Sequence, residues 1–421
     1  MRVLIISAFF PPLNNIASQR IAAFEKYLKQ MEHQVDVITR YYDLELISDP
    51  KMNVYEKSPS GMKDPYIRKD NVIYTNYDEI TPKKKKFDRM PPLIKGLYSY
   101  LSIDVYSYGW LKYVEMAFAN EFSKNKYDFI IASYGPPITL LAAKSISNKY
   151  NIPFIADFRD IFINEKDKGY HLSMKKWQQR FLLSKSSGLL FVSEGMKDFF
   201  KQKAGTLLNK IPSAMVMNGW DEPGTSKPEL SVELMEQLTS IQSRHSVLLL
   251  HTGTVYPDQE MRFFTSALKK LNETLTGKKA AILFVGLPAD IRDSKELAGE
   301  NVYFIPKVNL QTSLYLQKLA TALLIPVWHG RYTGFSGKLF EYIGSGNTVL
   351  VGPGMQKDVV DFTSNFRNVI HLKDYNDFNI IVSDLTESTR KQNIPVNHEK
   401  LTRAYWVKQL EIFLIALKKQ N

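Results

Sequence analysis

The sequence predicts an α/β protein built from two Rossmann-like, doubly wound parallel-sheet domains that face a cleft. The chain has 421 residues, too many for one core and suited to two domains of about 200 residues each. Short apolar runs of strand length alternate with segments of helical periodicity in both halves. Several of these runs end in glycine or charged residues, as strands do where an open parallel sheet binds ligands.

The first residues predict a strand, loop, helix and second strand in that order. Residues 1–10 are mostly apolar, helical periodicity runs from Ser18 to Met31, and Val35 to Thr39 predicts the next strand. A secretory signal peptide is the competing interpretation of Arg2 and the apolar run that follows it. It is disfavoured because the run is short, two prolines end it, and a charged helix comes next.

Charged residues crowd the end of the predicted strand at Phe154 to Ala156. Asp157, Arg159 and Asp160 follow this strand directly. Charges at the end of an apolar strand are costly unless they point into a polar cleft or pair with each other. We therefore expect these three residues in a functional site, and pairing that only ties two loops together is the alternative. Tyr134 follows a neighbouring predicted strand and is expected near the same edge.

The second half begins with a predicted strand from Val247 onward that ends in Gly253 and Thr254. A glycine at that point lets a diphosphate approach the end of the strand. Arg262 is the first basic residue after it, but its spacing favours Lys338 as the phosphate ligand. His251 is expected to be a strand residue.

The most informative segment is residues 333–346, where a glycine-rich loop runs into a short amphipathic helix. Helix N-termini offer unpaired N–H groups and a partial positive charge to a diphosphate. Glu341 lies one turn further along, where a carboxylate accepts hydrogen bonds from the two hydroxyls of a ribose. The local pattern alone fits equally well an ordinary strand-to-helix connection. The residues expected to bind a nucleotide donor here are Thr333, Gly334, Phe335, Ser336, Gly337, Lys338 and Glu341.

Residues 333–346 resemble the C-terminal signature of family 4 glycosyltransferases, which are retaining enzymes of the GT-B fold. Glu341 matches the second, ribose-binding glutamate of that signature, whereas Thr333 replaces the first. The resemblance extends to the loop after the first strand, where Asn14 and Asn15 replace a glycine pair that makes a tight turn. Asparagine tolerates left-handed backbone geometry, so the turn is expected to survive.

The resemblance implies roles for further residues. Arg20 and Asn15, with Tyr134, are expected near a phosphate or the acceptor, with an exposed helix-face arginine as the alternative for Arg20. Residues 157–160 are similar to an "Asp-x-Arg-Asp" element of one branch of the family, which implies a catalytic role. The expected boundaries are 1–215 for an acceptor-binding domain and 216–395 for a nucleotide-sugar-binding domain. Residues 396–421 are expected to form a C-terminal helix that crosses back to the first domain.

The composition of the chain argues against disulfides, metal sites and membrane spans. The chain has no cysteine, so disulfides and cysteine-based zinc sites do not arise. Histidines and acids do not cluster at metal-ligand spacing, and we expect neither a metal nor any other cofactor beyond the donor substrate. Apolar runs fall short of the about 18 residues that a membrane span needs. We therefore expect a cytoplasmic protein.

The net charge of +12 is unevenly distributed. Residues 83–113 carry four consecutive lysines, further basic residues and interleaved aromatics, a composition that an anionic membrane surface attracts. We expect peripheral attachment to the inner face of the plasma membrane through this segment. A solvated loop is the alternative, and nucleic acid is disfavoured because no nucleic-acid motif accompanies the charge.

The predicted function is transfer of a hexosyl or N-acetylhexosaminyl group from a nucleotide-diphosphate sugar to a glycan or lipid-linked saccharide, with retention, in surface polysaccharide biosynthesis. Two alternatives remain open. A non-hydrolysing nucleotide-sugar epimerase shares the fold, and a catalytically idle binding protein would be consistent with Thr333.

Overall fold

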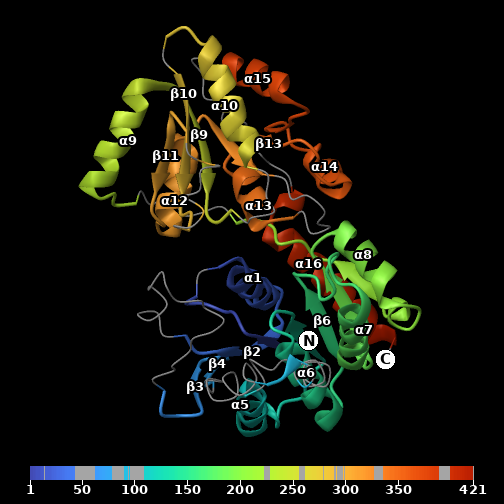
Figure 1. Ribbon diagram of the computed structural model, residues 1–421. Helices are drawn as coiled ribbons and strands as arrows, with labels where there is room; N and C mark the ends of the chain where they lie inside the picture. Colours follow the sequence, from blue (N-terminus) through green and yellow to red (C-terminus); the bar gives the residue numbers. More distant parts are fainter. Residues whose placement is uncertain are drawn as a thin grey trace. The chain divides into compact units, whose positions relative to one another are not determined.

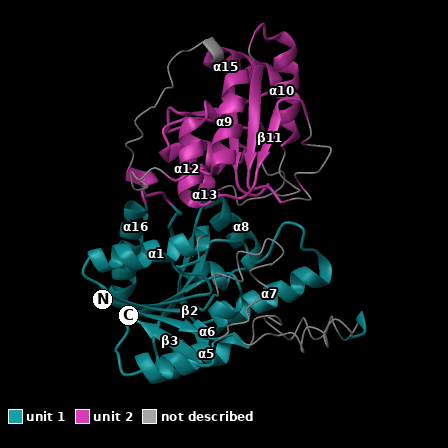
Figure 2. Ribbon diagram, turned by 90° about the vertical axis from the view of Figure 1, so that its left-hand side faces the viewer, with its two compact units in different colours: residues 1–218, 403–421 teal, residues 219–402 magenta. Residues whose placement is uncertain are grey.

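The computed structural model describes the chain in segments. They are residues 1–13, 15–42, 62–77, 90–92, 94, 109–221, 228–255, 261–277, 279–288, 291, 297, 299–326, 335–387 and 399–420. Contacts divide the chain into two compact units (Figure 2). Unit 1 comprises Met1–Asn218 and Arg403–Asn421, and unit 2 comprises Gly219–Thr402. The division falls between Asn218 and Gly219.

Unit 1 is built on an eight-stranded sheet in the order β3-β4-β2-β1-β5-β6-β7-β8. All described pairings are parallel except that of β3 with β4. The strands are β1 (Arg2–Ser7), β2 (Gln34–Arg40), β3 (Tyr66–Lys69), β4 (Val72–Thr75), β5 (Phe129–Ser133), β6 (Phe154–Phe158), β7 (Ser186–Phe191) and β8 (Ser213–Met215). Strand order reverses between β1 and β5, so the carboxyl ends of these strands mark the point where doubly wound sheets bind ligands.

Helices cover both faces of this sheet (Figure 1). They are α1 (Ile16–Gln30), α5 (Trp110–Ala117), α6 (Ile138–Tyr150), α7 (Gly169–Leu183), α8 (Glu194–Ala204) and α16 (Arg403–Gln420). A π-helix, Phe118–Phe122, follows α5, and a short 3-10 helix, Leu208–Lys210, precedes β8. One face packs in a single core with α5 to α8, in which Trp110 is fully buried. On the other face α1 packs against α16, the last helix of the chain.

Unit 2 is built on a six-stranded parallel sheet in the order β11-β10-β9-β12-β13-β14. Its strands are β9 (His245–Thr252), β10 (Lys279–Val285), β11 (Val302–Ile305), β12 (Ala322–Ile325), β13 (Thr348–Val351) and β14 (Val369–His371). The order reverses between β9 and β12. The carboxyl end of β9 is therefore the expected ligand position of this unit.

Helices also flank the sheet of unit 2. They are α9 (Val232–Arg244), α10 (Arg262–Thr274), α12 (Leu310–Leu319), α13 (Gly337–Gly344), α14 (Lys357–Thr363) and α15 (Tyr375–Glu387), with a short 3-10 helix at Glu399–Leu401. α10 and α15 share one core with the sheet, around Phe264 and Phe378. A Cβ on Gly344 would lie 2.5 Å from the Trp220 ring, so the end of α13 packs directly on that indole. The predicted fold class, two doubly wound parallel-sheet domains, is confirmed.

The start of α1 differs from the expected geometry. Asn15 has φ −139° and ψ 168°, an extended rather than a left-handed conformation. Its side-chain oxygen accepts a hydrogen bond of 2.8 Å from the N–H of Ser18, so Asn15 is the N-cap and α1 begins at Ile16. The left-handed geometry expected for the Asn14-Asn15 pair is therefore not found at Asn15, whose side chain caps the helix instead. Asn14 lies outside the described residues.

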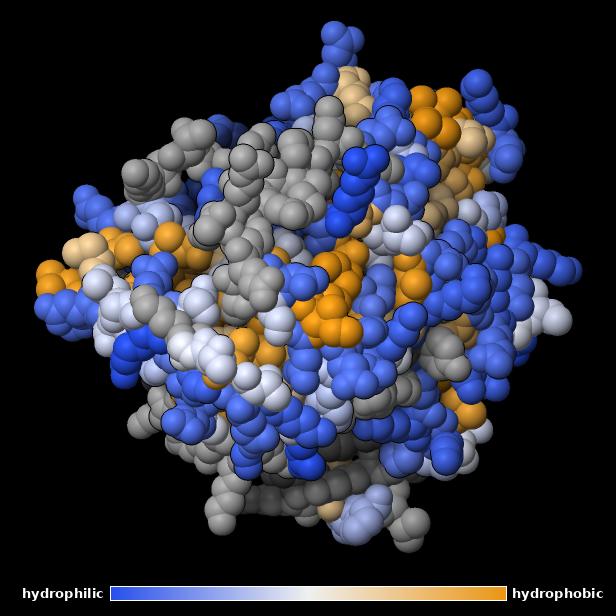
Figure 3. Space-filling view, turned by 90° about the horizontal axis from the view of Figure 1, so that it is seen from above, coloured by the Kyte–Doolittle hydropathy of each residue, from blue (hydrophilic) through white to orange (hydrophobic). Residues whose placement is uncertain are grey.

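Among the described residues, no helix combines the length and hydropathy of a membrane span. On the face shown in Figure 3, hydrophobic side chains form separate patches among hydrophilic ones. Scattered apolar side chains of this kind are ordinary for a folded domain.

Candidate functional site

In unit 2, α13 begins at the carboxyl edge of the sheet. Ser336 is its N-cap, with extended backbone geometry and a side-chain oxygen that accepts a 3.4 Å hydrogen bond from the N–H of Leu339. The helix therefore starts at Gly337, within the glycine-rich segment that the sequence singled out. Its first-turn N–H groups and the positive end of its dipole lie beside Lys338.

The ammonium of Lys338 lies at the end of β9. It donates a 2.8 Å hydrogen bond to the carbonyl oxygen of Thr254 and lies 3.4 Å from Nε2 of His251. His251 is buried, and its Nδ1 lies 2.9 Å from the carbonyl oxygen of Leu324 on β12. Nδ1 therefore carries the proton of the neutral ring, which leaves Nε2 to accept from Lys338. His251 thus joins the two strands at which the strand order reverses.

Burial shifts the protonation of both groups. Desolvation, together with the charge of Lys338, lowers the pKa of His251 to about 3, so the imidazole stays neutral. Desolvation also lowers the pKa of Lys338 to about 8, against the charge of Glu341, which raises it. Lys338 is therefore a cation at neutral pH, held in a partly dry position where its charge acts strongly on an anion.

This lysine position requires glycine at residue 253. A Cβ on Gly253 would lie 2.8 Å from Cε and 2.9 Å from Nζ of Lys338, closer than side chains approach. Gly253 also has φ +84°, a conformation that other residues rarely adopt. Gly286 at the end of β10 lies directly beside it, with 3.7 Å between its ideal Cβ position and the Cα of Gly253. The ends of β9 and β10 therefore present bare backbone next to a cation.

Tyr342 fixes the helix to the same strand end. Its hydroxyl accepts a 2.7 Å hydrogen bond from the N–H of Thr252 and lies 3.1 Å from the Thr252 hydroxyl. Tyr342 is fully buried, and desolvation raises the pKa of its phenol. Our sequence interpretation missed this residue. Its spacing of four from Lys338, which places both on one helix face, was the available signal.

The remaining predicted donor residues lie in different environments. Glu341 is half-buried on α13, close enough for its charge to act on Lys338. Phe335 is buried and packs its ring against Phe340 and Phe362, with centroids 6.1 and 5.3 Å away, so it anchors the loop. Arg262 is the exposed first residue of α10. Thr333 and Gly334 lie outside the described residues.

In unit 1, Arg20 and Asp157 form a buried ion pair. Nη2 of Arg20 lies 2.6 Å from Oδ1 of Asp157, and Nε lies 3.0 Å from Oδ2, so the pair is bidentate. Their side chains are 1% and 0% exposed. The hydroxyl of Ser133 at the end of β5 adds a 3.1 Å hydrogen bond to the carboxylate. The expected exposure of Asp157 and Arg20 to a ligand is not observed, because these groups satisfy each other in the core.

Arg159 and Asp160 lie nearer the surface. Nη1 of Arg159 is 3.0 Å from the carboxylate of Asp160, whose side chain is 63% exposed. Nη2 of Arg159 donates to the carbonyl oxygen of Gly135 at 3.2 Å. Its guanidinium also lies 5.1 Å from the centroid of the Phe9 ring. The structure therefore separates the three charges, with Asp157 turned into the core and the Arg159–Asp160 pair joining the ends of β1, β5 and β6.

Tyr134 follows β5 and is half-buried. Its ring packs against Phe158 and Phe162, with centroids 5.5 and 5.4 Å away. Within the described part of the chain, no three His, Asp or Glu side chains are grouped as a metal site would require.

Three solved structures are similar to this chain over its whole length. An E. coli trehalose-6-phosphate structure bound with UDP-2-fluoro glucose has a TM-score of 0.61 at 11% identity, covering 100% of this chain and 99% of that one. Sucrose-phosphate synthase from Thermosynechococcus elongatus has a TM-score of 0.58 at 10% identity, covering 100% and 96%. Anabaena HepE in complex with UDP has a TM-score of 0.56 at 12% identity, covering 100% and 98%.

These likenesses show that the chain has the GT-B fold, as the sequence resemblance implied. At 10 to 12% identity they establish the fold and not the activity. No protein-family model matches the chain, and no curated sequence matches it significantly.

The buried pair in unit 1 generates a stability prediction. Asp157→Asn leaves the Arg20 cation buried without its counter-charge, so we expect the free energy of unfolding to fall by about 3 kcal/mol or more. Asp160→Asn removes an exposed partner and should cost about 1 kcal/mol or less. Denaturant unfolding followed by circular dichroism measures both. Wild-type stability of Asp157→Asn combined with lost activity would instead support a ligand-contacting role for Asp157.

Proposed function

We propose that the protein transfers a sugar from a nucleotide-diphosphate sugar to a glycan or lipid-linked saccharide, and that unit 2 binds the donor. The observation that carries this proposal is the position of Lys338, held across Gly253 at the carboxyl end of β9 and beside the first turn of α13. Two solved structures with the same fold contain UDP or a UDP-sugar analogue. Our proposal assigns the same class of donor to this chain.

The diphosphate is proposed to lie against the bare backbone of Gly253 and Gly286. The Lys338 ammonium has three N–H groups, and its contacts with Thr254 and His251 use two of them. The third N–H is proposed to donate a hydrogen bond to the diphosphate. The N–H groups of the first turn of α13 add to this charge. Because these donors are held in place before the reaction, they stabilise the leaving diphosphate without reorganisation. Our proposal uses no metal for this step.

Glu341 is proposed to bind the ribose hydroxyls of the donor. In unit 1, Arg159, Asp160 and Tyr134 are proposed to lie near the acceptor, with Arg20 and Asp157 holding the end of β6. We further propose attack of the acceptor hydroxyl from the leaving-group face, with retention, and a role in surface polysaccharide synthesis. The anomeric configuration of a purified product tests retention. Donor hydrolysis or epimerisation without an acceptor would favour the epimerase alternative.

Removing the Glu341 carboxylate tests the donor site. Glu341→Ala should weaken binding of the preferred nucleoside diphosphate by about 1.5 to 3 kcal/mol, because a charge-assisted contact is lost. The control is Glu273→Ala, which removes an exposed carboxylate on α10. Calorimetric titration with a panel of nucleoside diphosphates measures the change. Equal affinities of wild type and Glu341→Ala for every nucleotide that binds would remove this assignment.

The lowered pKa of Lys338 predicts a pH dependence. Only the protonated amine attracts the diphosphate. The affinity for a nucleoside diphosphate should therefore be highest at pH values below the Lys338 pKa of about 8, and it should decline as pH rises above that value. The decline should reach at most about tenfold per pH unit, the limit for one proton. Lys338→Met should bind weakly throughout and show no such slope, whereas Lys269→Met on α10 should behave as wild type. A wild-type affinity for nucleoside diphosphate that stays constant between about pH 7 and about pH 9.5 would contradict the role of Lys338.

Membrane attachment through residues 83–113 is also proposed, and it rests on charge and aromatic content alone. Residues 83–89, 93 and 95–108 lie outside the described residues. Replacing Lys83 to Lys86 with glutamine should release the protein from anionic liposomes, since each basic residue contributes about 1 kcal/mol near such a surface. Wild-type protein that ignores these liposomes at low salt would show the proposal to be incorrect.

A further inference from the structure

Helix α7 of unit 1 carries an exposed aromatic face. Tyr170, Trp177 and Phe181 are 50, 39 and 41% exposed. Together with the half-buried Met174 they recur at intervals of four, three and four residues, so they lie along one side of the helix. In the described part of the chain, every exposed phenylalanine, tryptophan or tyrosine side chain lies on this helix. Exposed apolar side chains that gather in this way mark an interaction surface.

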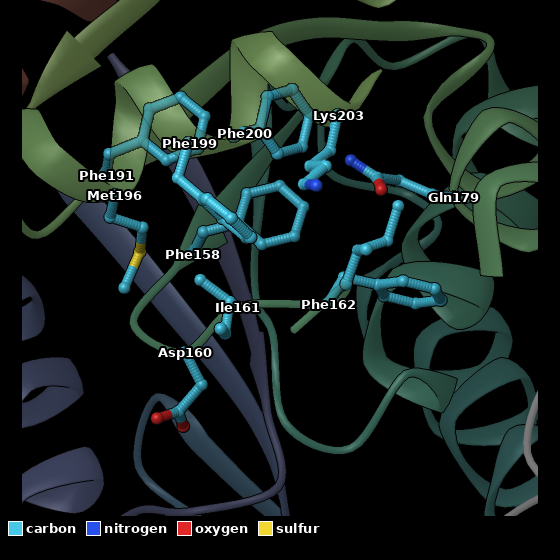
Figure 4. A pocket seen from close by; sticks show the side chains of 11 residues that line it. Phe158, Asp160, Ile161, Phe162, Gln179, Phe191, Met196, Phe199, Phe200 and Lys203 are labelled. Atoms are coloured by element: carbon cyan, nitrogen blue, oxygen red, sulfur yellow. The ribbon is translucent and has the colours of Figure 1, made fainter. Parts of the chain in front are cut away.

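The opposite side of α7 is packed inside unit 1. Leu182 and Leu183 are fully buried, and Gln179 is 2% exposed. Figure 4 shows the Gln179 side chain turned toward Phe200 and Lys203 of α8, which lies next to α7 in Figure 1. The helix is therefore apolar on two sides, and only one of them is used by the core.

Contacts within unit 1 hold the exposed rings in place. Trp177 and Phe181 stack with a centroid distance of 5.8 Å and an interplanar angle of 17°. The ammonium of Lys144 on α6 lies 3.6 Å from the centroid of the Phe181 ring and donates to the carbonyl oxygen of the same residue. Because these contacts order the side chains in the unbound protein, less conformational entropy is lost when the face binds a partner.

Basic side chains flank the aromatic face. Residues 164–185 contain six lysines or arginines and two acidic residues. One of the acids, Asp167, is 2.7 Å from the ammonium of Lys175, and its side chain is 11% exposed. The exposed bases beside the rings are Lys176, Arg180 and Lys185. The surface around the rings is therefore positively charged.

We propose that α7 lies on the surface of an anionic lipid bilayer, with Tyr170, Trp177 and Phe181 at the boundary between head groups and acyl chains. Tyrosine and tryptophan favour this boundary because their rings are apolar and their polar atoms reach the wet side. The flanking bases attract anionic head groups. This inference goes beyond the proposed sugar transfer, and it uses described residues outside the 83–113 segment.

The combination of rings and bases favours a bilayer over other partners. A second copy of this chain docked symmetrically through α7 would bring the same positive charges together. An acidic polymer would satisfy the bases but offer no apolar atoms to the rings. An anionic bilayer supplies negative charge and apolar surface at once.

Co-flotation of the full chain with liposomes tests the inference. Wild type should bind vesicles that contain phosphatidylglycerol at least about tenfold more tightly than vesicles of phosphatidylcholine alone, and this binding should weaken as salt rises. Protein that ignores phosphatidylglycerol vesicles at low salt would overturn the inference. Equally tight, α7-dependent binding to soluble polyglutamate would also overturn it, because an acidic partner would then suffice.

Removing the aromatic groups assigns the binding to α7. Trp177→Gln combined with Phe181→Gln should weaken vesicle binding by about tenfold or more. The control is Ile412→Gln combined with Ile415→Gln, which removes two exposed apolar side chains of α16 and should leave binding unchanged. Melting temperatures verify that each variant is folded. Wild-type vesicle binding by the folded α7 variant would overturn the assignment.

Removing the charges gives an independent test. Lys176→Gln combined with Arg180→Gln should weaken vesicle binding by about tenfold and make the remaining binding less sensitive to salt. Lys269→Gln combined with Lys270→Gln removes the same charge from the exposed side of α10 and should have no such effect. Equal losses in both pairs would mean that net charge, and not α7, attracts the vesicles.

Trp177 also reports its own position. Brominated acyl chains should quench the tryptophan emission of wild type, and this quenching should be largely lost in Trp177→Phe, which keeps an aromatic side chain and still binds. The other described tryptophans, Trp110, Trp220 and Trp406, are not exposed. Equal quenching in both proteins would place another part of the chain in the bilayer and overturn the inference.

Two further measurements separate this surface from the other proposals. Loss of vesicle binding on replacement of Lys83 to Lys86 with glutamine, but not in the α7 variants, would support attachment through residues 83–113 and overturn the α7 surface. Nucleotide affinity should be unchanged in every α7 variant, because the proposed donor site lies in unit 2. Failure of the donor site and failure of the membrane surface therefore appear in different titrations.

Discussion

The missing side chain at Gly253 is the constraint on which the candidate donor site depends. Lys338 lies where a Cβ of residue 253 would lie, and it is held there by the Thr254 carbonyl and by His251. His251 in turn reaches across to Leu324 on β12. Any side chain at residue 253 would displace the lysine from a position at which two strand ends and a helix terminus meet.

Burial gives this lysine its chemistry. A surface lysine is a fully hydrated charge with a weak influence on a ligand, whereas Lys338 has lost part of its hydration and its pKa falls to about 8. His251 stays neutral beside it because burial and the neighbouring cation both disfavour a second charge. Tyr342 prevents the helix from moving away from the strand. The result is one cation supported by neutral groups, which suits an anionic ligand.

Unit 1 buries two opposite charges together, whereas unit 2 holds the single cation of Lys338 among neutral groups. Arg20 and Asp157 neutralise each other inside the core, so neither charge is available on the surface. A bidentate pair of this kind fixes α1 against the end of β6 and thereby positions the adjacent Arg159 and Asp160. Gln179 on α7 differs, because its buried Oε1 has no hydrogen-bond partner among the described residues.

The amino-acid sequence determined the fold class and singled out the segment that forms α13. Alternating apolar runs and helical segments specify parallel sheets because each strand and helix must bury one face. The loop that runs into the short helix α13 also followed from local pattern, since capping and helix periodicity involve residues close in the chain. The roles of individual charged residues did not follow in the same way.

Only the tertiary structure decided which charges meet. Arg20 and Asp157 are separated by 137 positions and Lys338 and His251 by 87, and nothing in their local sequence distinguishes a core pair from two exposed site residues. Asn15 is a helix cap for a local reason, because its side chain accepts from an N–H three residues further along the chain. Long-range packing sets desolvation and pairing, and these decide whether a charged or polar group stabilises the fold or remains available to a ligand.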